Sequence, residues 1–129
     1  MFIKKLPVVV LSVLSFSAMA DVTLVKADLI GTWHIDKESV NSDGSSGRSS
    51  NATWQFKEDG TIEGTSEDSD SHARINQTRA VLNYSLEGGK LIKQAAPGRS
   101  KMETCVAVEK EGSKMVLKCS SNYFFMSKK

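Results

Sequence analysis

The residue types that could carry chemistry are few in this chain of 129 residues, and two cysteines are the most informative of them. Cys105 and Cys119 could form a redox-active pair, but such pairs are typically closely spaced, as in C-x-x-C. They lie instead on two strand-like runs that join at residues 111–113. If these three residues form the loop, Lys110 faces Lys114 and the register places the cysteines opposite each other. We therefore predict a structural cross-strand disulfide.

Catalysis and metal binding have little support in the sequence. His34 alternates with Trp33, so we expect this lone histidine on the outer face of a strand. The chain has no G-x-S-x-G, Gly-rich phosphate loop or H-E-x-x-H. Asp68, Asp70 and His72 alternate, but a calcium loop needs more oxygen ligands, a turn glycine and a distal glutamate. We therefore expect no enzyme activity, no metal ion and no cofactor.

Residues 1–20 have the pattern of a secretory signal peptide. Two lysines precede an apolar run that ends in Ala18-Met19-Ala20, and small residues at these positions suit signal peptidase. The run falls short of the about 20 apolar residues that a spanning helix needs. We predict cleavage before Asp21 and export to the periplasm, or release from the cell. The mature domain is then 21–129, with no stable membrane insertion.

Charge is balanced in this mature domain but segregated along it. Residues 21–70 carry 11 acidic and 4 basic side chains, and residues 71–129 carry 11 basic and 4 acidic ones. Whether the surface is dipolar depends on how the two halves are arranged in the fold. No basic cluster is interleaved with aromatic residues, so we expect no nucleic-acid partner.

Beyond residue 30 the chain is a succession of short apolar or alternating runs, separated by turn sequences such as Asp59-Gly60 and Gly88-Gly89. Residues 22–30 carry a weak helical spacing that Gly31 ends. The pattern predicts an all-β fold with a short N-terminal helical turn: a small antiparallel meander of about eight strands that closes into a barrel or folds as a sandwich. The runs are residues 32–36, 53–57, 61–65, 73–78, 81–86, 90–94, 102–110, 114–120 and 123–127.

Three segments stand out from this meander. Residues 38–50 are rich in serine and glycine, and residues 66–72 are acidic and rich in serine, so we expect both to be solvated loops. Residues 123–127 are apolar on both faces of a strand. One of these faces must be covered by the N-terminal turn, by a partner or by a ligand, or it remains as an exposed apolar patch.

Several short motifs resemble those of lipocalin-like proteins, over residues 28–127. Residues 29–36 (LIGTWHID) resemble the first lipocalin strand, in which a helical turn leads into a Gly-x-Trp that closes one end of the barrel. Residues 54–62 (WQFKEDGTI) resemble the F-x-x-D-G-T hairpin of small bacterial lipocalin-like domains. The runs at 84–92, 115–117 and 123–125 follow in the order that this family shows.

The chain also departs from the family. Typical lipocalins place an arginine of a late strand across the first-strand tryptophan, whereas here no arginine follows Arg99. The mature chain is shorter than a typical lipocalin, so a closed barrel leaves room for one small ligand at most.

Two functions follow from these observations. The resemblance implies an exported binding protein that holds a small apolar molecule in or at the mouth of the barrel. Side chains on the predicted inner face are the candidate ligand-binding residues: Trp33, Trp54, Phe56, Tyr84 and Leu117. The alternative is a periplasmic protein-binding module, such as an inhibitor, an immunity protein or an envelope accessory protein. It would bind another envelope protein through loops 38–50 and 66–72 or through strand 123–127.

Overall fold

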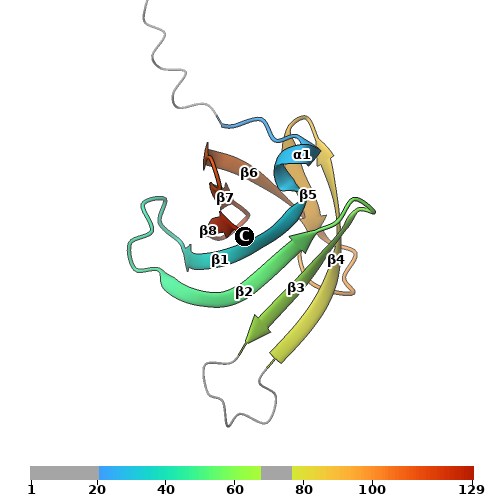
Figure 1. The fold of residues 1–129 in the computed structure, drawn as a ribbon, viewed down its shortest axis with the longest axis horizontal. Helices are drawn as coiled ribbons and strands as arrows, with labels where there is room; N and C mark the ends of the chain where they lie inside the picture. The colour runs from blue at the N-terminus through green and yellow to red at the C-terminus, as the bar shows by residue number, and fades with distance from the viewer. Residues whose placement is uncertain (1–20, 68–76) are drawn as a thin grey trace, which may run out of the picture.

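The chain forms a closed antiparallel barrel in which each strand pairs with its neighbours in sequence and the first strand pairs with the last (Figure 1). The computed structural model describes residues 21–67 and 77–129, so the predicted signal peptide and residues 68–72 of the second loop lie outside it. Within these ranges, no helix has the length and apolar character that a membrane crossing requires. The elements are α1 (Lys26–Leu29), β1 (Gly31–Ser39), β2 (Arg48–Phe56), β3 (Thr61–Glu67), β4 (Gln77–Glu87), β5 (Lys90–Gln94), β6 (Met102–Glu111), β7 (Lys114–Lys118) and β8 (Tyr123–Lys128).

This architecture confirms the predicted all-β meander and its N-terminal helical turn, and it selects the barrel over the sandwich. The predicted break between the runs 73–78 and 81–86 is wrong, because β4 continues through Arg79 and Ala80, and residues 73–76 of the first run lie outside the described residues. The first loop is also shorter than predicted. The two flanking strands pair as far as Glu38 and Arg48, which leaves residues 40–47 as the connection.

The core fills the barrel with the side chains that period-2 alternation assigns to its inner face. Trp33, Ile35 and Phe56 are fully buried there, and Trp54 and Leu82 are partly buried against them. Alternating strands present every second side chain to the interior, so the apolar pattern alone fixes which residues meet.

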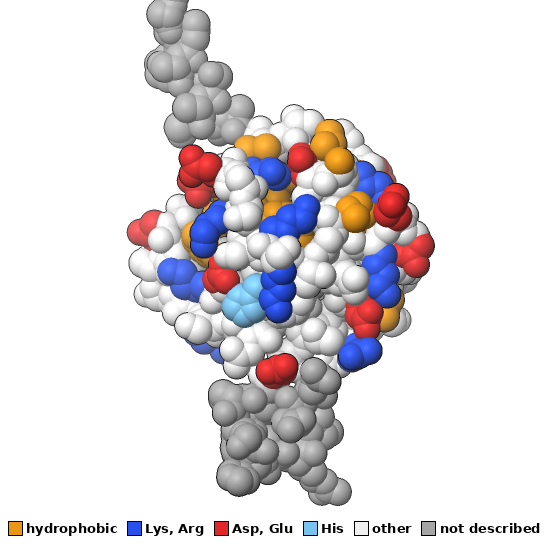
Figure 2. All heavy atoms as spheres, in the orientation of Figure 1, with side chains coloured by type: hydrophobic (Ala, Val, Ile, Leu, Met, Phe, Trp, Pro, Cys, Tyr) orange, Lys and Arg blue, Asp and Glu red, His pale blue; other side chains and the backbone are white. Residues whose placement is uncertain are grey.

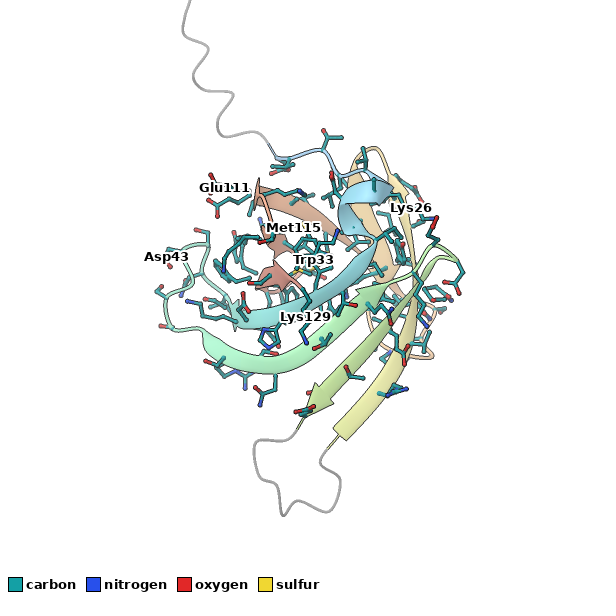
Figure 3. The ribbon with its side chains drawn as sticks, viewed as in Figure 1. Lys26, Trp33, Asp43, Glu111, Met115 and Lys129 are labelled. Carbon is teal, nitrogen blue, oxygen red and sulfur yellow. A yellow bond between two sulfur atoms is a disulfide. The ribbon has the colours of Figure 1, made fainter. Side chains whose placement is uncertain are left out.

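One end of the barrel is closed by the N-terminal segment. The Trp33 indole N–H donates a hydrogen bond to the Leu29 carbonyl at 2.9 Å, inside the barrel below α1 (Figure 3). The Lys128 ammonium lies 5.5 Å from the centre of the Trp33 ring. Gly31 has a φ of +129°, and a Cβ there would lie 2.8 Å from Cε of Lys128. Lys128 therefore supplies the cation that the absent arginine would have placed over the tryptophan.

The hairpin of β6 and β7 brings the two cysteines together by a different route from the predicted one. The predicted three-residue loop is wrong: Glu111 pairs with Lys114, so the turn has two residues. A β-bulge at Val108 then shifts the register by one residue, and the two changes cancel. Cys105 and Cys119 therefore face each other as predicted and form a disulfide, with their Cα atoms 4.2 Å apart.

The chain buries Met126 on the inner face of strand β8 and partly covers the outer face of this strand. Met126 points into the core, where only 1% of its surface is exposed. On the outer face, the Lys37 ammonium lies 5.3 Å from the centre of the Phe125 ring. A β-bulge in β1 between Ile35 and Lys37 allows this lysine to lie outside, and Gly44 of the first loop packs against the same ring. The N-terminal turn has no part in this cover.

The strand order keeps the acidic and basic halves of the chain apart. Strands β1 to β3 form one side of the barrel and β4 to β8 the other, because the meander places strands in sequence order. On the face shown in Figure 2, acidic and basic side chains are nevertheless intermixed, and the hydrophobic ones form only small groups. The segregation of charge along the sequence therefore produces no single-sign patch on this face.

Candidate ligand-binding site at the open end of the barrel

The two ends of the barrel are built differently. The short turns between β2 and β3, β4 and β5, and β6 and β7 lie at the closed end, together with α1. The two longer connections among the described residues, 40–47 and 95–101, lie at the opposite end together with the four-residue connection 119–122. Loops that a rigid scaffold holds in place often carry binding residues.

Two adjoining cavities open at this loop end. The larger has a volume of about 450 Å³ and mixes apolar and polar side chains: Trp54, Leu82, Lys93, Ala95, Glu103, Cys119, Ser120, Ser121, Asn122 and Phe124. The smaller has a volume of about 230 Å³ and is almost wholly apolar, with a lining of Ala52, Trp54, Gly64, Thr65, Ser66, Thr78, Ala80, Leu82 and Pro97. We call them the polar cavity and the apolar cavity.

Trp54 and Leu82 line both cavities, so the two cavities adjoin along these side chains. On one side the Trp54 ring lies against Phe124, with ring centres 5.0 Å apart. On the other side it lies over its cross-strand partner Gly64, where a Cβ would be 3.7 Å from Cδ1 of the indole. Because Gly64 has no side chain, space remains beside the ring, and that space is part of the apolar cavity.

A buried ion pair forms the wall of the polar cavity. Lys93 and Glu103 are directly opposite each other on β5 and β6, and Nζ lies 2.5 Å from Oε2. Only 6% of the lysine side chain and 15% of the glutamate side chain are exposed. The other carboxylate oxygen of Glu103 accepts a hydrogen bond from the Ser120 hydroxyl. The Lys93 ammonium also lies 5.6 Å from the centre of the Trp54 ring.

These contacts control the ionisation of Glu103. Burial alone would raise the pKa of the carboxyl, because it penalises the charged form. The hydrogen bonds from Lys93 and Ser120, with the lysine charge, outweigh burial together and lower the pKa below its ordinary value of 4.5. Glu103 is therefore ionised at neutral pH, and the pair has no net charge.

The sequence-predicted ligand residues separate into two groups. Trp54 lines both cavities. Phe56 and Tyr84 lie beneath it as an edge-to-face pair, with ring centres 5.3 Å apart, and the Tyr84 hydroxyl donates to the Lys57 carbonyl. Trp33 and Leu117 are completely buried in the core. Of the five candidates, Trp54 thus lines these two cavities, and the other four lie in the packing of the described core.

Sequence reasoning missed the polar members of the site. Lys93 shares a strand face with Leu91, and Glu103 shares one with Cys105, so period-2 alternation already placed both charges inside. The sequence signal that could have revealed this ion pair is a lysine and a glutamate at inward-facing positions of two neighbouring strands. Phe124 was noted only as part of a strand that is apolar on both faces.

The cysteine pair also approaches this ion pair. Ligand atoms of Glu103, Cys105 and Cys119 lie within 4.8 Å of one another. The two sulfur atoms are bonded to each other. They are therefore not thiolates and are not available as metal ligands. The disulfide instead packs next to the Glu103 carboxylate.

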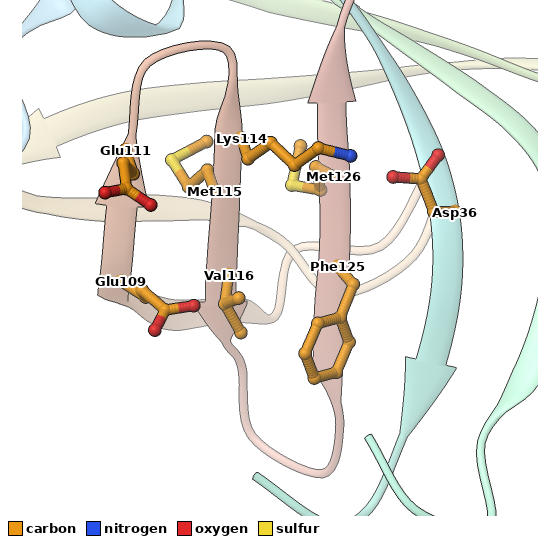
Figure 4. Close-up of a pocket in the computed structure, with 8 residues that line it drawn as sticks. All are labelled: Asp36, Glu109, Glu111, Lys114, Met115, Val116, Phe125 and Met126. Atoms are coloured by element: carbon orange, nitrogen blue, oxygen red, sulfur yellow. The ribbon is translucent and has the colours of Figure 1, made fainter. Parts of the chain in front are cut away.

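A third hollow, with a volume of about 250 Å³, lies on the outside of the barrel across β6, β7, β8 and β1 (Figure 4). Val116 and Phe125, which are cross-strand partners, supply apolar surface, and Asp36, Glu109 and Glu111 supply carboxylates around it. Hydrogen bonds from Ser127 and His34 outweigh the opposing effect of burial and lower the pKa of Asp36. We call this hollow the outer groove.

The comparisons with known proteins support the fold. The structure is similar to the crystal structure of a lipocalin-like protein from Bacteroides uniformis, with a TM-score of 0.61 and 17% sequence identity over 79% of this chain and 99% of that one. No protein-family model and no curated protein matches the sequence. The fold is therefore lipocalin-like, as the motifs at 29–36 and 54–62 implied.

Proposed function

We propose that this protein is an exported, non-catalytic binding protein that takes up a small, mainly apolar molecule at the open end of its barrel. The observation that carries the proposal is the pair of adjoining cavities on the two sides of Trp54. A concave site lined by aromatic and aliphatic side chains with few polar groups is the usual form of a small-molecule site.

Several features support this function. The apolar cavity gains its space from the small residues Gly64 and Ala80, which leave room beside Trp54 and Leu82. Desolvation of the cavity walls would supply the affinity. The disulfide below the polar cavity suits the oxidising compartment that the predicted signal peptide would deliver the protein to.

The experiment uses the two tryptophans as internal reporters. Naphthalene, an apolar probe close in size to an indole, is titrated into the ¹⁵N-labelled protein, and the two indole N–H signals are followed by NMR. We expect the Trp54 signal to move and the Trp33 signal to stay, because only Trp54 lines the cavities. Substitution of Trp54→Ala should abolish binding. If neither signal moves, or if Trp54→Ala binds as well as the unchanged protein, the proposal is wrong.

A second candidate function, protein binding at the outer groove, has one observation in its favour. Three carboxylates (Asp36, Glu109 and Glu111) and one lysine (Lys114) line the groove with the apolar Val116 and Phe125, and this net negative lining suits a basic segment of an envelope protein. Native mass spectrometry of protein purified from the periplasm distinguishes the two candidates. An additional mass of a few hundred daltons, estimated from cavity size, favours the small ligand, and an additional polypeptide favours the groove.

A further inference from the structure

We propose that the ligand is an uncharged molecule with an apolar body, which fills the apolar cavity, and a single hydrogen-bond acceptor, such as a ketone or ester carbonyl, which binds the Lys93 ammonium. This inference rests on the proposed function and specifies the chemistry of the same site. It follows from how the donors and acceptors of the ion pair are already used.

Lys93 has hydrogen-bonding capacity left on the cavity side. An ammonium group has three N–H donors. Glu103 takes one at 2.5 Å, and the Gln94 carbonyl lies at a marginal 3.5 Å. Among the described residues, the remaining neighbour is the face of Trp54, with 5.6 Å from Nζ to the ring centre. A ligand acceptor placed beside that ring would give this donor a partner of full strength.

Glu103, by contrast, has little capacity to offer. One of its carboxylate oxygens accepts from Lys93, and the other accepts from both the hydroxyl and the backbone N–H of Ser120. A ligand donor such as an alcohol or amine would have to compete with these contacts. The site therefore favours a ligand that accepts a hydrogen bond over one that donates it.

The charge of the pair selects against charged ligands. Lys93 and Glu103 neutralise each other in a wall that is largely withdrawn from water. A bound carboxylate would add a second negative charge beside Glu103, and a bound amine would add a second positive charge beside Lys93. Either charge would lose its hydration without gaining an unshared partner, which is costly in a low-dielectric site.

The apolar body has a defined place. Trp54 and Leu82 line both cavities, and the Lys93 ammonium lies 5.6 Å from the centre of the Trp54 ring, so a group in the apolar cavity can extend past this ring to the lysine. The apolar cavity of about 230 Å³ exceeds the engineered cavity of about 150 Å³ that holds a benzene molecule. A group of two fused rings or a short branched chain fits this space.

Four matched probes test the inference: naphthalene, 2-acetylnaphthalene, 2-naphthoate and 2-naphthylmethylamine. They share one ring system and differ only in the attached group. At pH 7, we expect 2-acetylnaphthalene to bind about tenfold more tightly than naphthalene, the gain of one hydrogen bond to a charged donor. The carboxylate and the amine should both bind more weakly than the ketone. Affinities are measured by calorimetry, with the Trp54 indole signal as the check on location.

A double substitution, Lys93→Met with Glu103→Gln, identifies the donor. It removes both charges together and leaves an acceptor for Ser120, so the barrel keeps its packing. We expect this variant to bind naphthalene as before and to lose the preference for the ketone. Lys93→Arg, which keeps a charged donor, should retain part of it.

The outcomes separate this inference from the function on which it rests. If none of the probes moves the Trp54 signal, the proposed function itself fails. If naphthalene and its ketone bind equally, or if the carboxylate binds most tightly, the site binds small molecules but the inference about their chemistry is overturned. Retention of the ketone preference in the double variant would also overturn it.

Discussion

The two tryptophans are cross-strand partners, but their side chains lie in different environments. Trp33 and Trp54 are direct partners in the register of β1 and β2, and both side chains point into the barrel. Trp33 is fully buried, with its N–H bound to the Leu29 carbonyl and Lys128 over its ring. Trp54 is only partly buried and has a cavity on each side. One closes the barrel, and the other lines its mouth.

The difference lies in what packs around each ring. At the closed end, short turns and α1 enclose Trp33, and its indole N–H is bound to the Leu29 carbonyl within the chain. At the open end, Gly64 and the longer connections leave space, and a buried charge pair faces into it. Stability and binding are therefore assigned to opposite ends of one barrel, and substitutions can test this division.

The largest difference is expected between alanine substitutions of the two tryptophans. Trp33→Ala should lower the free energy of unfolding by about 3–5 kcal/mol, because it empties a fully enclosed site. Trp54→Ala should cost about 1–2 kcal/mol, since its ring already borders open space. Urea unfolding measures both values. Equal losses of unfolding free energy in the two variants would contradict the assignment of stability to the closed end and binding to the open end. If Trp33→Ala fails to fold, Trp33→Phe provides a milder variant.

Removal of the disulfide should have the next largest effect. The bridge joins residues 14 apart in the chain, and replacing both cysteines by alanine should destabilise the barrel by about 3 kcal/mol. Reduction of the unchanged protein should produce a similar loss and should leave the double variant unaffected. If the double variant unfolds at the same urea concentration as the original, the bridge does not stabilise the open end.

The ion pair should show a smaller effect that depends on which partner is removed. Lys93→Met alone leaves Glu103 without its main partner and should cost about 2 kcal/mol. The double substitution with Glu103→Gln should recover most of this loss, because no unpaired charge remains. Thermal unfolding of the three proteins provides the comparison. A double variant that is less stable than Lys93→Met would contradict this account of the pair.

The smallest effect should be the pH dependence of stability. Glu103 and Asp36 both have a lowered pKa in the folded protein. Their stabilising contribution is complete above the ordinary carboxyl pKa and is lost as the pH falls through the lowered one. Glu103→Gln and Asp36→Asn should therefore each reduce the loss of stability on acidification. Added salt should weaken the contribution of the half-exposed Asp36 more than that of Glu103. Unfolding curves at several pH values and two salt concentrations measure both effects.

Much of the fold could be predicted from the sequence because it depends on local patterns. Alternation assigned Trp33, Ile35 and Phe56 to the interior, and turn glycines separated the strands. The positive φ of Gly31 at the entry to β1 agrees with the sharp turn that the Gly-x-Trp motif implied. The pairing of the cysteines followed from hairpin register alone.

The features that could not be predicted depend on contacts between distant segments. The bulge at Val108 compensates for a shorter turn, and no local pattern distinguishes this combination from the three-residue loop. The cover of Phe125 comes from Lys37 and Gly44 on a segment more than 80 positions earlier in the chain. The cavity depends on which side chains leave space beside Trp54, and this is known only when β2, β3 and β4 are placed together.

The closure of the barrel has a consequence for how the chain reaches this state. Strand β1 must pair with β8, and contacts such as that of Asp36 with Ser127 join residues 91 apart. Until β8 has been synthesised and has paired with β1, one edge of β1 keeps its backbone N–H and C=O groups unpaired. Such a distant contact slows folding, and an open strand edge invites association with other chains. Pairing of β8 with β1 thus covers the open edge of β1 and prevents its association with other chains.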